Sequence, residues 1–227
     1  SYNTNKTEAV VDLTFGNHGD LGNYNNFGSP IGAGISSTAL AIKQAYVTYK
    51  ATDKLALTAG QFITHVGYEA IDAPVNYNYS LSNLFANGPF YHTGIKASYT
   101  ASDKVALMAG VVDGIDSKDD SNKSKGIIGQ ITLKPTSTLG IYLNYFRSNE
   151  ATTGQKSIWN LYDIVGNYQV TGKFYMGINA TYGSQDSKNW SGVALYSNYA
   201  LTDKFSLGGR YEYFDNKSVI RGLRSAD

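Results

Sequence analysis

The sequence predicts an antiparallel β-barrel that spans a membrane, and this prediction rests on three observations. A polar turn of one design recurs at residues 52–54, 102–104 and 202–204, and a strand of alternating apolar residues follows each copy. The strand before each turn ends in a tyrosine. Hydrophobic residues make up 42% of the chain and charged residues only 16%. Such turns, aromatic strand ends and alternating strands are typical of barrels whose strands cross a bilayer.

Segments with the length of a tilted transmembrane strand follow one another along the chain. We expect strands at residues 7–15, 39–50, 54–64, 90–99, 105–112, 126–134, 139–147, 157–169, 173–183, 190–200 and 205–214. Short turns alternate with mostly longer connections rich in Asn, Asp, Ser and Gly, as in bacterial barrels with short periplasmic turns and longer extracellular loops. The first strand is therefore expected to run outward from the periplasm.

Alternation within the clearest strands separates an apolar face from a polar one. Strand 173–183, for example, places Met176 and Ile178 on one side and Gly177 and Asn179 on the other. We expect the apolar side to face lipid and the polar side to face the lumen. The strand residues that we predict to line the pore are His92, Lys96, Gln130, Asn144, Asp163, Asn179, Arg210 and Glu212.

Two features leave alternatives open. Strands 39–50 and 190–200 do not separate into faces, because polar residues are adjacent in the first and tyrosines fall on opposite parities in the second. A bulge or a plugged lumen explains either case. A soluble β-sandwich also alternates, but it has no need for aromatic residues at one level or for connections of alternating length. The barrel is therefore preferred.

Several segments carry a resemblance to a known family. They read QAYV at 44–47, LALTAGQF at 55–62, GYE at 67–69, NYNYS at 76–80, FYHTGI at 90–95 and GVVDG at 110–114. They resemble the signature region of the OmpL-like β-barrel porin-2 family, common in Bacteroidetes, including its HTG strand and its GVVNGWD loop entry. The resemblance is best over residues 40–116. Two positions depart from it, since Gln61 stands where Lys is common and Asp113 where Asn is common.

This resemblance implies a porin in the outer membrane of a Gram-negative bacterium, with no catalytic residues to carry over. Family members are longer than 227 residues, and bacterial single-chain barrels close with an even number of strands. We therefore expect residues 1–227 to be a single barrel domain in a partial chain. Residues 217–224 would begin a twelfth strand and further C-terminal strands would follow, so that the barrel has at least 12 strands.

The connection 65–89 is the most distinctive candidate for function. It mixes tyrosines with carboxylate, amide and hydroxyl groups, which suits a polar solute with an apolar face. A surface loop whose Asn and Gly residues merely satisfy turns is the alternative. If the loop folds inward, Glu69 joins the pore-lining set, and its charge opposite Lys96 and Arg210 would create a transverse field that filters ions.

Other kinds of site receive little support from the sequence. The connection 113–125 holds Asp113, Asp116, Asp119 and Asp120, but it lacks the Gly and bidentate Glu of an EF-hand calcium loop. A Ser-His-Asp triad would need Ser80 or Ser82, His65 or His92, and Asp72 or Asp163, none of them within a nucleophile motif. A net charge of +1 gives no basis for binding nucleic acid, and the absence of cysteine excludes a thiolate metal site.

We therefore expect an outer-membrane porin, not an enzyme, that passes small hydrophilic solutes by passive diffusion. Such transport needs no cofactor and no metal. The expected partners are the lipid bilayer with its lipopolysaccharide, the solutes, and copies of the chain or other outer-membrane proteins. The alternative is a plugged structural or partner-binding barrel within an envelope complex. Inward Asn, Gly and Arg favour a pore, whereas inward Tyr142, Phe146 and Tyr175 favour filling.

Overall fold

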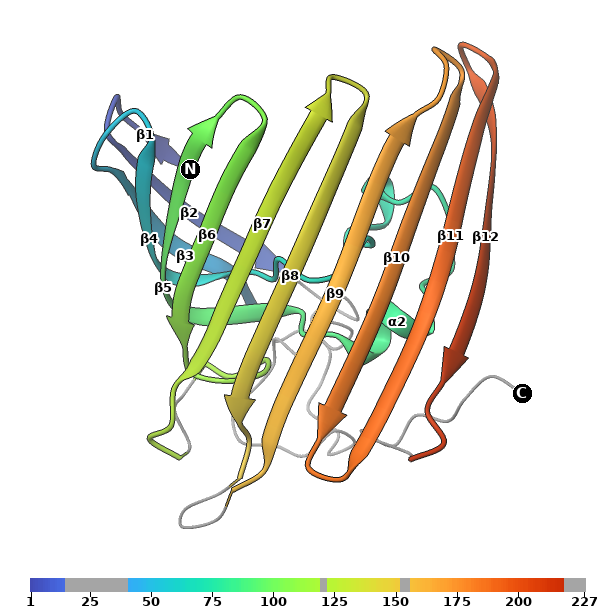
Figure 1. The fold of residues 1–227 in the computed structure, drawn as a ribbon. Coiled ribbons are helices and arrows are strands. Elements are labelled where there is room, and N and C mark those ends of the chain that lie inside the picture. Colours follow the sequence, from blue (N-terminus) through green and yellow to red (C-terminus); the bar gives the residue numbers. More distant parts are fainter. Residues whose placement is uncertain (15–40, 119–121, 152–155, 219–227) are drawn as a thin grey trace.

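The computed structural model describes residues 1–14, 41–118, 122–151 and 156–218. Over these ranges, twelve antiparallel strands form one sheet in which each strand pairs with its neighbours in sequence. They are β1 (Tyr2–Asn3), β2 (Thr7–Thr14), β3 (Ala41–Lys50), β4 (Leu55–Ile63), β5 (Tyr91–Ser102), β6 (Val105–Val112), β7 (Gly126–Thr136), β8 (Leu139–Asn149), β9 (Ile158–Gln169), β10 (Phe174–Gln185), β11 (Lys188–Thr202) and β12 (Phe205–Asp215). The sheet curves like the wall of a barrel (Figure 1), and the predicted all-β antiparallel fold is confirmed.

Two short helical segments interrupt the link between β4 and β5. They are the 3-10 helix η1 (Ala73–Val75) and the helix α2 (Asn83–Asn87). Figure 1 shows α2 on the inner side of the curved sheet. No helix in the described ranges is long and apolar enough to cross a membrane.

The short hairpins share one hydrogen-bonding device. The Thr52 hydroxyl accepts hydrogen bonds from the amides of Lys54 and Leu55, at 3.2 and 3.0 Å. The Thr202 hydroxyl repeats both contacts with the next turn of the same design, and the Ser102 hydroxyl accepts from the amide two residues on. A hydroxyl that satisfies turn amides in this way explains why the sequence repeats this turn.

The two faces of the sheet differ as the alternation predicts. On β10, Met176 and Ile178 are exposed on the outer face, whereas Gly177 and Asn179 are buried on the inner face. The tyrosines before the repeated turns, Tyr49, Tyr99 and Tyr199, are exposed beside other apolar outer residues. An outer face of exposed Ile, Leu, Val and Tyr would be costly in water and is suited to lipid.

A bulge resolves the ambiguous strand β3. Asp12 pairs with Gln44 and Leu13 with Ile42, so that Lys43 has no opposite residue on β2. The extra residue turns both Lys43 and Gln44 inward, and Ile42 remains exposed outside. In β11, Tyr196 is buried inside and Tyr199 exposed outside, so the two tyrosines do face opposite ways.

The boundaries differ from the predicted ones in a few places. The prediction missed β1, which pairs only two residues with β2. It also expected a longer connection at 184–189, but β10 and β11 stay paired up to Gln185 and Lys188. Asp186, with φ of 54°, begins this two-residue turn. The predicted twelfth strand at 217–224 falls mainly on residues outside the described ranges.

Candidate functional site

Residues 64–90, which we call the inward loop, cross the inner face of the sheet instead of extending away from it. The loop leaves β4 and contacts the strands of the opposite wall in turn. The contacts run from His65 with Tyr145 on β8, through Gly67 with Asp163 on β9 and Tyr68 with Tyr175 on β10, to Glu69 with Arg210 on β12. The inward alternative for this connection, rather than the surface-loop alternative, therefore describes the structure.

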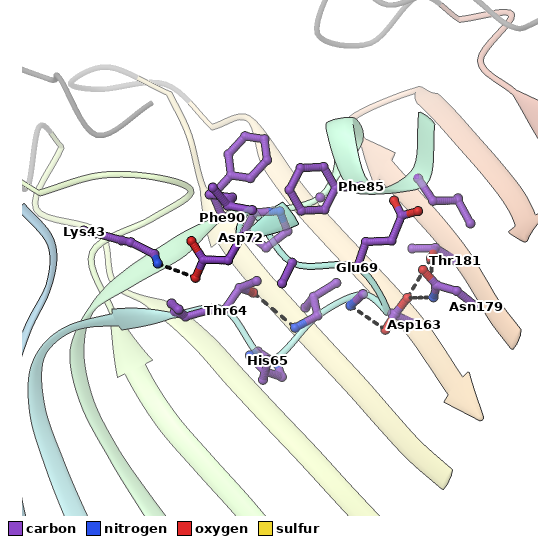
Figure 2. Close-up of a pocket in the computed structure, with 18 residues that line it drawn as sticks. Lys43, Thr64, His65, Glu69, Asp72, Phe85, Phe90, Asp163, Asn179 and Thr181 are labelled. Carbon is purple, nitrogen blue, oxygen red and sulfur yellow. Dashed lines mark hydrogen bonds and ion pairs between the residues drawn. The ribbon is translucent and has the colours of Figure 1, made fainter. Parts of the chain in front are cut away.

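Asp163 is the central anchor of the loop on the wall. Its buried carboxylate accepts the amide N–H of Gly67 at 3.0 Å and the side-chain NH2 of Asn144 at 2.7 Å. It also accepts from the side chains of Asn179 and Thr181 (Figure 2). A carboxylate that is 1% exposed is stable only when its oxygens are hydrogen-bonded. Four donors, from the two neighbouring strands β8 and β10 and from the loop, meet this need.

The Glu69 carboxylate and the Arg210 guanidinium form a second anchor. They lie 2.7 Å apart, and the exposed fraction of the Glu69 side chain is only 2%. Glu69 also accepts from the amide and hydroxyl of Ser82, whereas Arg210 donates to Ser80 and to the Leu81 carbonyl. The two charges are therefore paired in contact, and they do not face each other across an open lumen as the transverse-field hypothesis assumed.

Two side chains from outside the helix hold the first turn of α2. The Ser82 hydroxyl accepts from the amide of Phe85 and so caps the helix. Glu212 of β12 accepts from the amides of Asn83 and Leu84, at 3.0 and 2.9 Å. Carboxylates and hydroxyls satisfy the free amides at a helix start, so these contacts fix the helix on β12.

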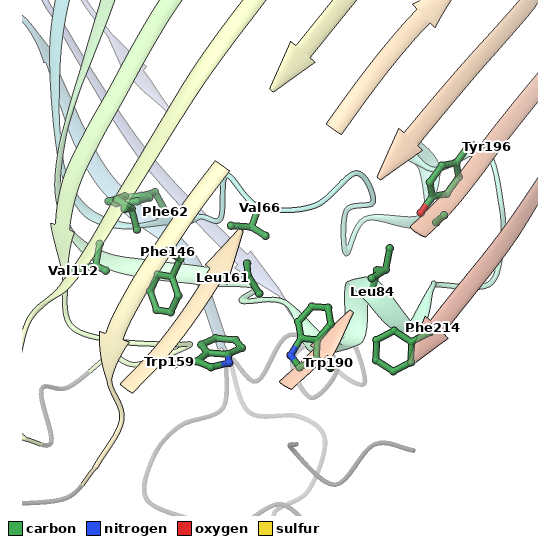
Figure 3. Packing of buried hydrophobic residues seen from close by; sticks show 12 residues of the cluster. Phe62, Val66, Leu84, Val112, Phe146, Trp159, Leu161, Trp190, Tyr196 and Phe214 are labelled. Carbon is green, nitrogen blue, oxygen red and sulfur yellow. The ribbon is translucent and has the colours of Figure 1, made fainter. Parts of the chain in front are cut away.

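Apolar side chains fill the space between the loop and the wall. Figure 3 shows Val66 and Leu84 of the loop near Trp159, Trp190 and other wall residues. These side chains belong to one buried cluster. Burying large aromatic side chains contributes strongly to stability, so the loop is packed as well as hydrogen-bonded.

A further ion pair joins the loop to the β3 bulge. The Lys43 ammonium contacts the Asp72 carboxylate of the loop and lies 3.3 Å from Asp12 of β2. Figure 2 shows this pair at one end of a cavity of about 180 Å³, with Phe85 and Phe90 nearby. The bulge thus presents a cation to the loop that a regular strand would have turned outward.

Burial holds His65 in its neutral form. Its Nε2 lies 3.1 Å from the Tyr145 carbonyl, and its Nδ1 is buried with no partner in the described residues. Desolvation, with a smaller contribution from the charge of Lys96, lowers the pKa of His65 from 6.5 to about 4. A protonated ring would be a buried charge without a counter-ion.

We expect acid to loosen the inward loop. A released His65 binds a proton near pH 6.5 and the docked one only near pH 4, so docking weakens as the pH falls through this window. The loss approaches about 3 kcal/mol at 1.36 kcal/mol per unit. Channel conductance measured from pH 7 to pH 4.5 should rise, and His65→Gln should flatten the rise between pH 6.5 and 5. An unchanged profile in this variant would contradict the assignment.

The structure brings most of the predicted pore-lining residues into contact with the loop. One hydrogen-bonded row of side chains crosses β7 to β10. In it Gln130 donates to Asn144 at 2.7 Å, and Asn144 and Asn179 both donate to Asp163. Glu69, Arg210 and Glu212 belong to the anchors already described. That these residues line a pore stays a prediction, because their contacts show only that they face inward.

His92 and Lys96 of β5 lie apart from this row. The His92 ring is completely buried, 5.5 Å from the His65 ring, and its Nε2 contacts the Thr64 hydroxyl. The Lys96 ammonium lies 4.1 Å from the centre of the Phe62 ring. The Lys96 ammonium therefore lies against an aromatic ring, whereas the Glu69 carboxylate pairs with Arg210.

Sequence reasoning missed two residues that the loop uses. The bulge in β3 interrupts the alternation, so the pattern did not assign Lys43 to the inner face. Gly177 was assigned to the inner face but not to the loop, yet a Cβ there would lie 2.5 Å from the Tyr68 ring. The small inward residue on β10 is the signal that a side chain from elsewhere covers this spot.

The other kinds of site considered from the sequence gain no geometric support in the described residues. Asp113 pairs with Lys125 at 2.7 Å, and Asp116 accepts from the amides of Phe90 and Tyr91. Asp119 and Asp120 lie outside the described ranges. Within those ranges no group of three or more His, Asp or Glu residues is arranged to hold a metal ion.

The candidate triad is likewise not assembled. The Nε2 atoms of His65 and His92 contact Tyr145 and Thr64. Ser82 contacts Glu69 and the amide of Phe85. The described contacts therefore place neither histidine beside a candidate serine.

A comparison with models of known families identifies the class of protein. The family model described as "Putative beta-barrel porin-2, OmpL-like" matches residues 1–226. No curated protein matches the sequence. Two solved structures are similar. One is the CymD monoaromatic hydrocarbon channel, with 12% identity over 77% of this chain and 68% of that chain and a TM-score of 0.41. The other is OmpTdeltaL8, a loop L8 deletion mutant of the outer membrane protein OmpT of Vibrio cholerae, with 13% identity over 78% and 75% and a TM-score of 0.42.

Proposed function

The chain belongs to the beta-barrel porin-2, OmpL-like family and lies in the outer membrane, and from this premise we propose that small hydrophilic solutes diffuse passively through its lumen. The observation that carries the proposal is the inward loop, which polar anchors fix on the inner wall. A loop held in this way narrows the lumen but does not close it. Passive diffusion requires no reacting group, which fits a site built from anchors and not from a nucleophile and base.

The inner face away from the loop supports a pore more than a plug. Residues of β3, β4 and β5 line a recess of about 390 Å³, and a recess of about 450 Å³ lies at the turn between β7 and β8. The first is lined by polar groups such as Gln44, Thr48 and Thr58, together with Lys96. Polar recesses of this kind suit water and hydrophilic solutes.

The alternative of a plugged barrel is favoured by one observation, the aromatic cluster between loop and wall. Trp159, Trp190, Phe146 and Phe214 are buried there. This cluster lies beneath the inward loop (Figure 3), and we infer that it supports the loop. It would block transport only if the same packing continued through the recesses on the inner face.

Electrical recording of the full-length protein in planar lipid bilayers tests the proposal. We expect stable, ohmic current steps, and swelling of liposomes that contain the protein in solutions of small sugars and amino acids. Heat-dependent mobility on gels checks that the barrel is folded and inserted. A folded, inserted barrel that never conducts and supports no swelling would contradict a porin and favour the plugged barrel.

A further inference from the structure

A second cavity lies between the inward loop and strands β7, β8 and β9. It measures about 220 Å³ and is lined by Tyr68, Gln130, Tyr142, Asn144, Val165 and Asn167, with His65 and Gly67 at the loop. On a comparable measure a water molecule needs about 10–15 Å³. The cavity therefore has room for a small solute and not only for solvent.

A chain of hydrogen bonds orients one polar wall of this cavity. The Tyr68 hydroxyl donates to the Tyr175 hydroxyl at 3.0 Å, and Tyr175 donates to the Oδ1 of Asn167 at 2.8 Å. Because Oδ1 is the acceptor, the NH2 group of Asn167 remains as a donor. Within the described residues neither this NH2 group nor the Tyr142 hydroxyl makes a hydrogen bond, so both are available to a ligand.

Aromatic rings form the adjoining surface. The rings that line the cavity are Tyr68 and Tyr142, and the Tyr68 ring is held in place by stacking on Tyr196 at 3.9 Å and by covering Gly177. The electron-rich faces of such rings attract the weakly positive C–H groups of a saturated ring. Rings beside amide and hydroxyl groups can hold a solute that has both C–H faces and hydroxyl edges.

The cavity has no charged lining. None of its lining residues is Asp, Glu, Lys or Arg, and His65 is neutral at pH 7 for the reason given above. The buried Asp163 carboxylate accepts from the lining residues Gly67 and Asn144 and from other donors, so its hydrogen-bonding positions are filled while its negative charge remains. An anion that entered would lose hydration without gaining a counter-charge, whereas a neutral polyol would exchange water for amide and hydroxyl partners.

We propose that this cavity is a binding subsite for an uncharged sugar ring on the diffusion pathway, with the Tyr142 hydroxyl and the Asn167 amide as the polar contacts and the Tyr68 and Tyr142 rings as the apolar surface. The inference rests on the proposed function, because the cavity lies on a diffusion pathway only if the lumen conducts. It assigns a solute class to the porin, which the family description does not define.

Current block by sugar tests the subsite in the full-length protein. We expect D-glucose to reduce the ion current in a saturable manner, whereas glucuronate, which carries a carboxylate on the same ring, blocks much less. Tyr142→Ala should raise the half-blocking glucose concentration about five- to tenfold, as loss of one aromatic contact predicts. The matched control is Tyr162→Ala, which removes an exposed ring from the outer face of the neighbouring strand.

Three results would overturn the subsite. They are conduction without saturable block, block by glucose that Tyr142→Ala leaves unchanged, and equal block by glucuronate. The first of these leaves the porin proposal intact, because ions still flow. Calorimetric titration of glucose into the detergent-folded protein gives an independent readout. If the barrel does not conduct, glucose binding that Tyr142→Ala weakens supports the subsite alone, and the absence of binding overturns both proposals.

Discussion

Replacing Asp163 with alanine should release the inward loop from the wall. The buried carboxylate is the common acceptor for Gly67, Asn144, Asn179 and Thr181, and its removal takes this acceptor from all four, although Asn179 still reaches the Ile164 carbonyl. Each buried donor left unsatisfied costs about 1–3 kcal/mol. Neighbouring losses do not add fully, so we expect a loss of about 3 kcal/mol or more in the free energy of unfolding. Larger current steps should accompany it.

Denaturant unfolding and single-channel recording of the same preparation measure both effects. Asp203→Ala is the matched control, since it removes an exposed carboxylate from a hairpin turn and leaves the loop untouched. If Asp163→Ala has the same current steps and the same free energy of unfolding as the unaltered protein, this carboxylate does not hold the loop.

Replacing Arg210 with glutamine should cost more than replacing its partner. The Glu69 carboxylate is 2% exposed and would stay buried without its cation. Breaking a buried ion pair in this way costs about 3–5 kcal/mol. Glu69→Gln removes the charge that needs compensation, so the double variant Glu69→Gln/Arg210→Gln should recover part of the stability that Arg210→Gln loses.

A double-mutant cycle on the free energy of unfolding measures this coupling. Single-channel recordings of the same four proteins should show larger steps in Arg210→Gln, because Arg210 also holds Ser80 and Leu81. Strictly additive single effects would contradict the buried pair. A change in ion selectivity without a change in step size would instead support the transverse-field hypothesis.

The faces of the strands were predictable because a strand has a period of two residues. On β10 the pattern alone separated Met176 and Ile178 from Asn179, as the structure has them. The pattern failed on β3, where one extra residue, Lys43, shifts the period within the strand. A bulge of one residue leaves no composition signal, so only the adjacent polar residues hinted at it.

The position of the inward loop could not be predicted from the sequence, for a different reason. Asn, Gly and Tyr suit a surface turn and an inner wall equally well, and the partners of the loop lie on strands up to 141 positions away, as for Glu69 and Arg210. The direction of such long-range contacts depends on how the whole sheet curves. The length of the connection between β10 and β11 was overpredicted for another reason. Its polar residues resemble a loop, although they remain paired in the sheet.

The central claim, that the inward loop lies against the inner wall, is tested most directly by a disulfide. A Cβ at Gly208 of β12 would lie 3.6 Å from the Cβ of Tyr77 in the loop, within the range of about 3.5–4.5 Å found in disulfides. The chain has no cysteine of its own, so any bond formed is the engineered one. Tyr77→Cys with Gly208→Cys should cross-link in the folded protein, as a mobility shift on gels that reductant reverses. Tyr77→Cys with Gly209→Cys, on the outer face, should not. Failure of the first pair to cross-link under mild oxidation, or equal cross-linking of both pairs, would contradict the claim.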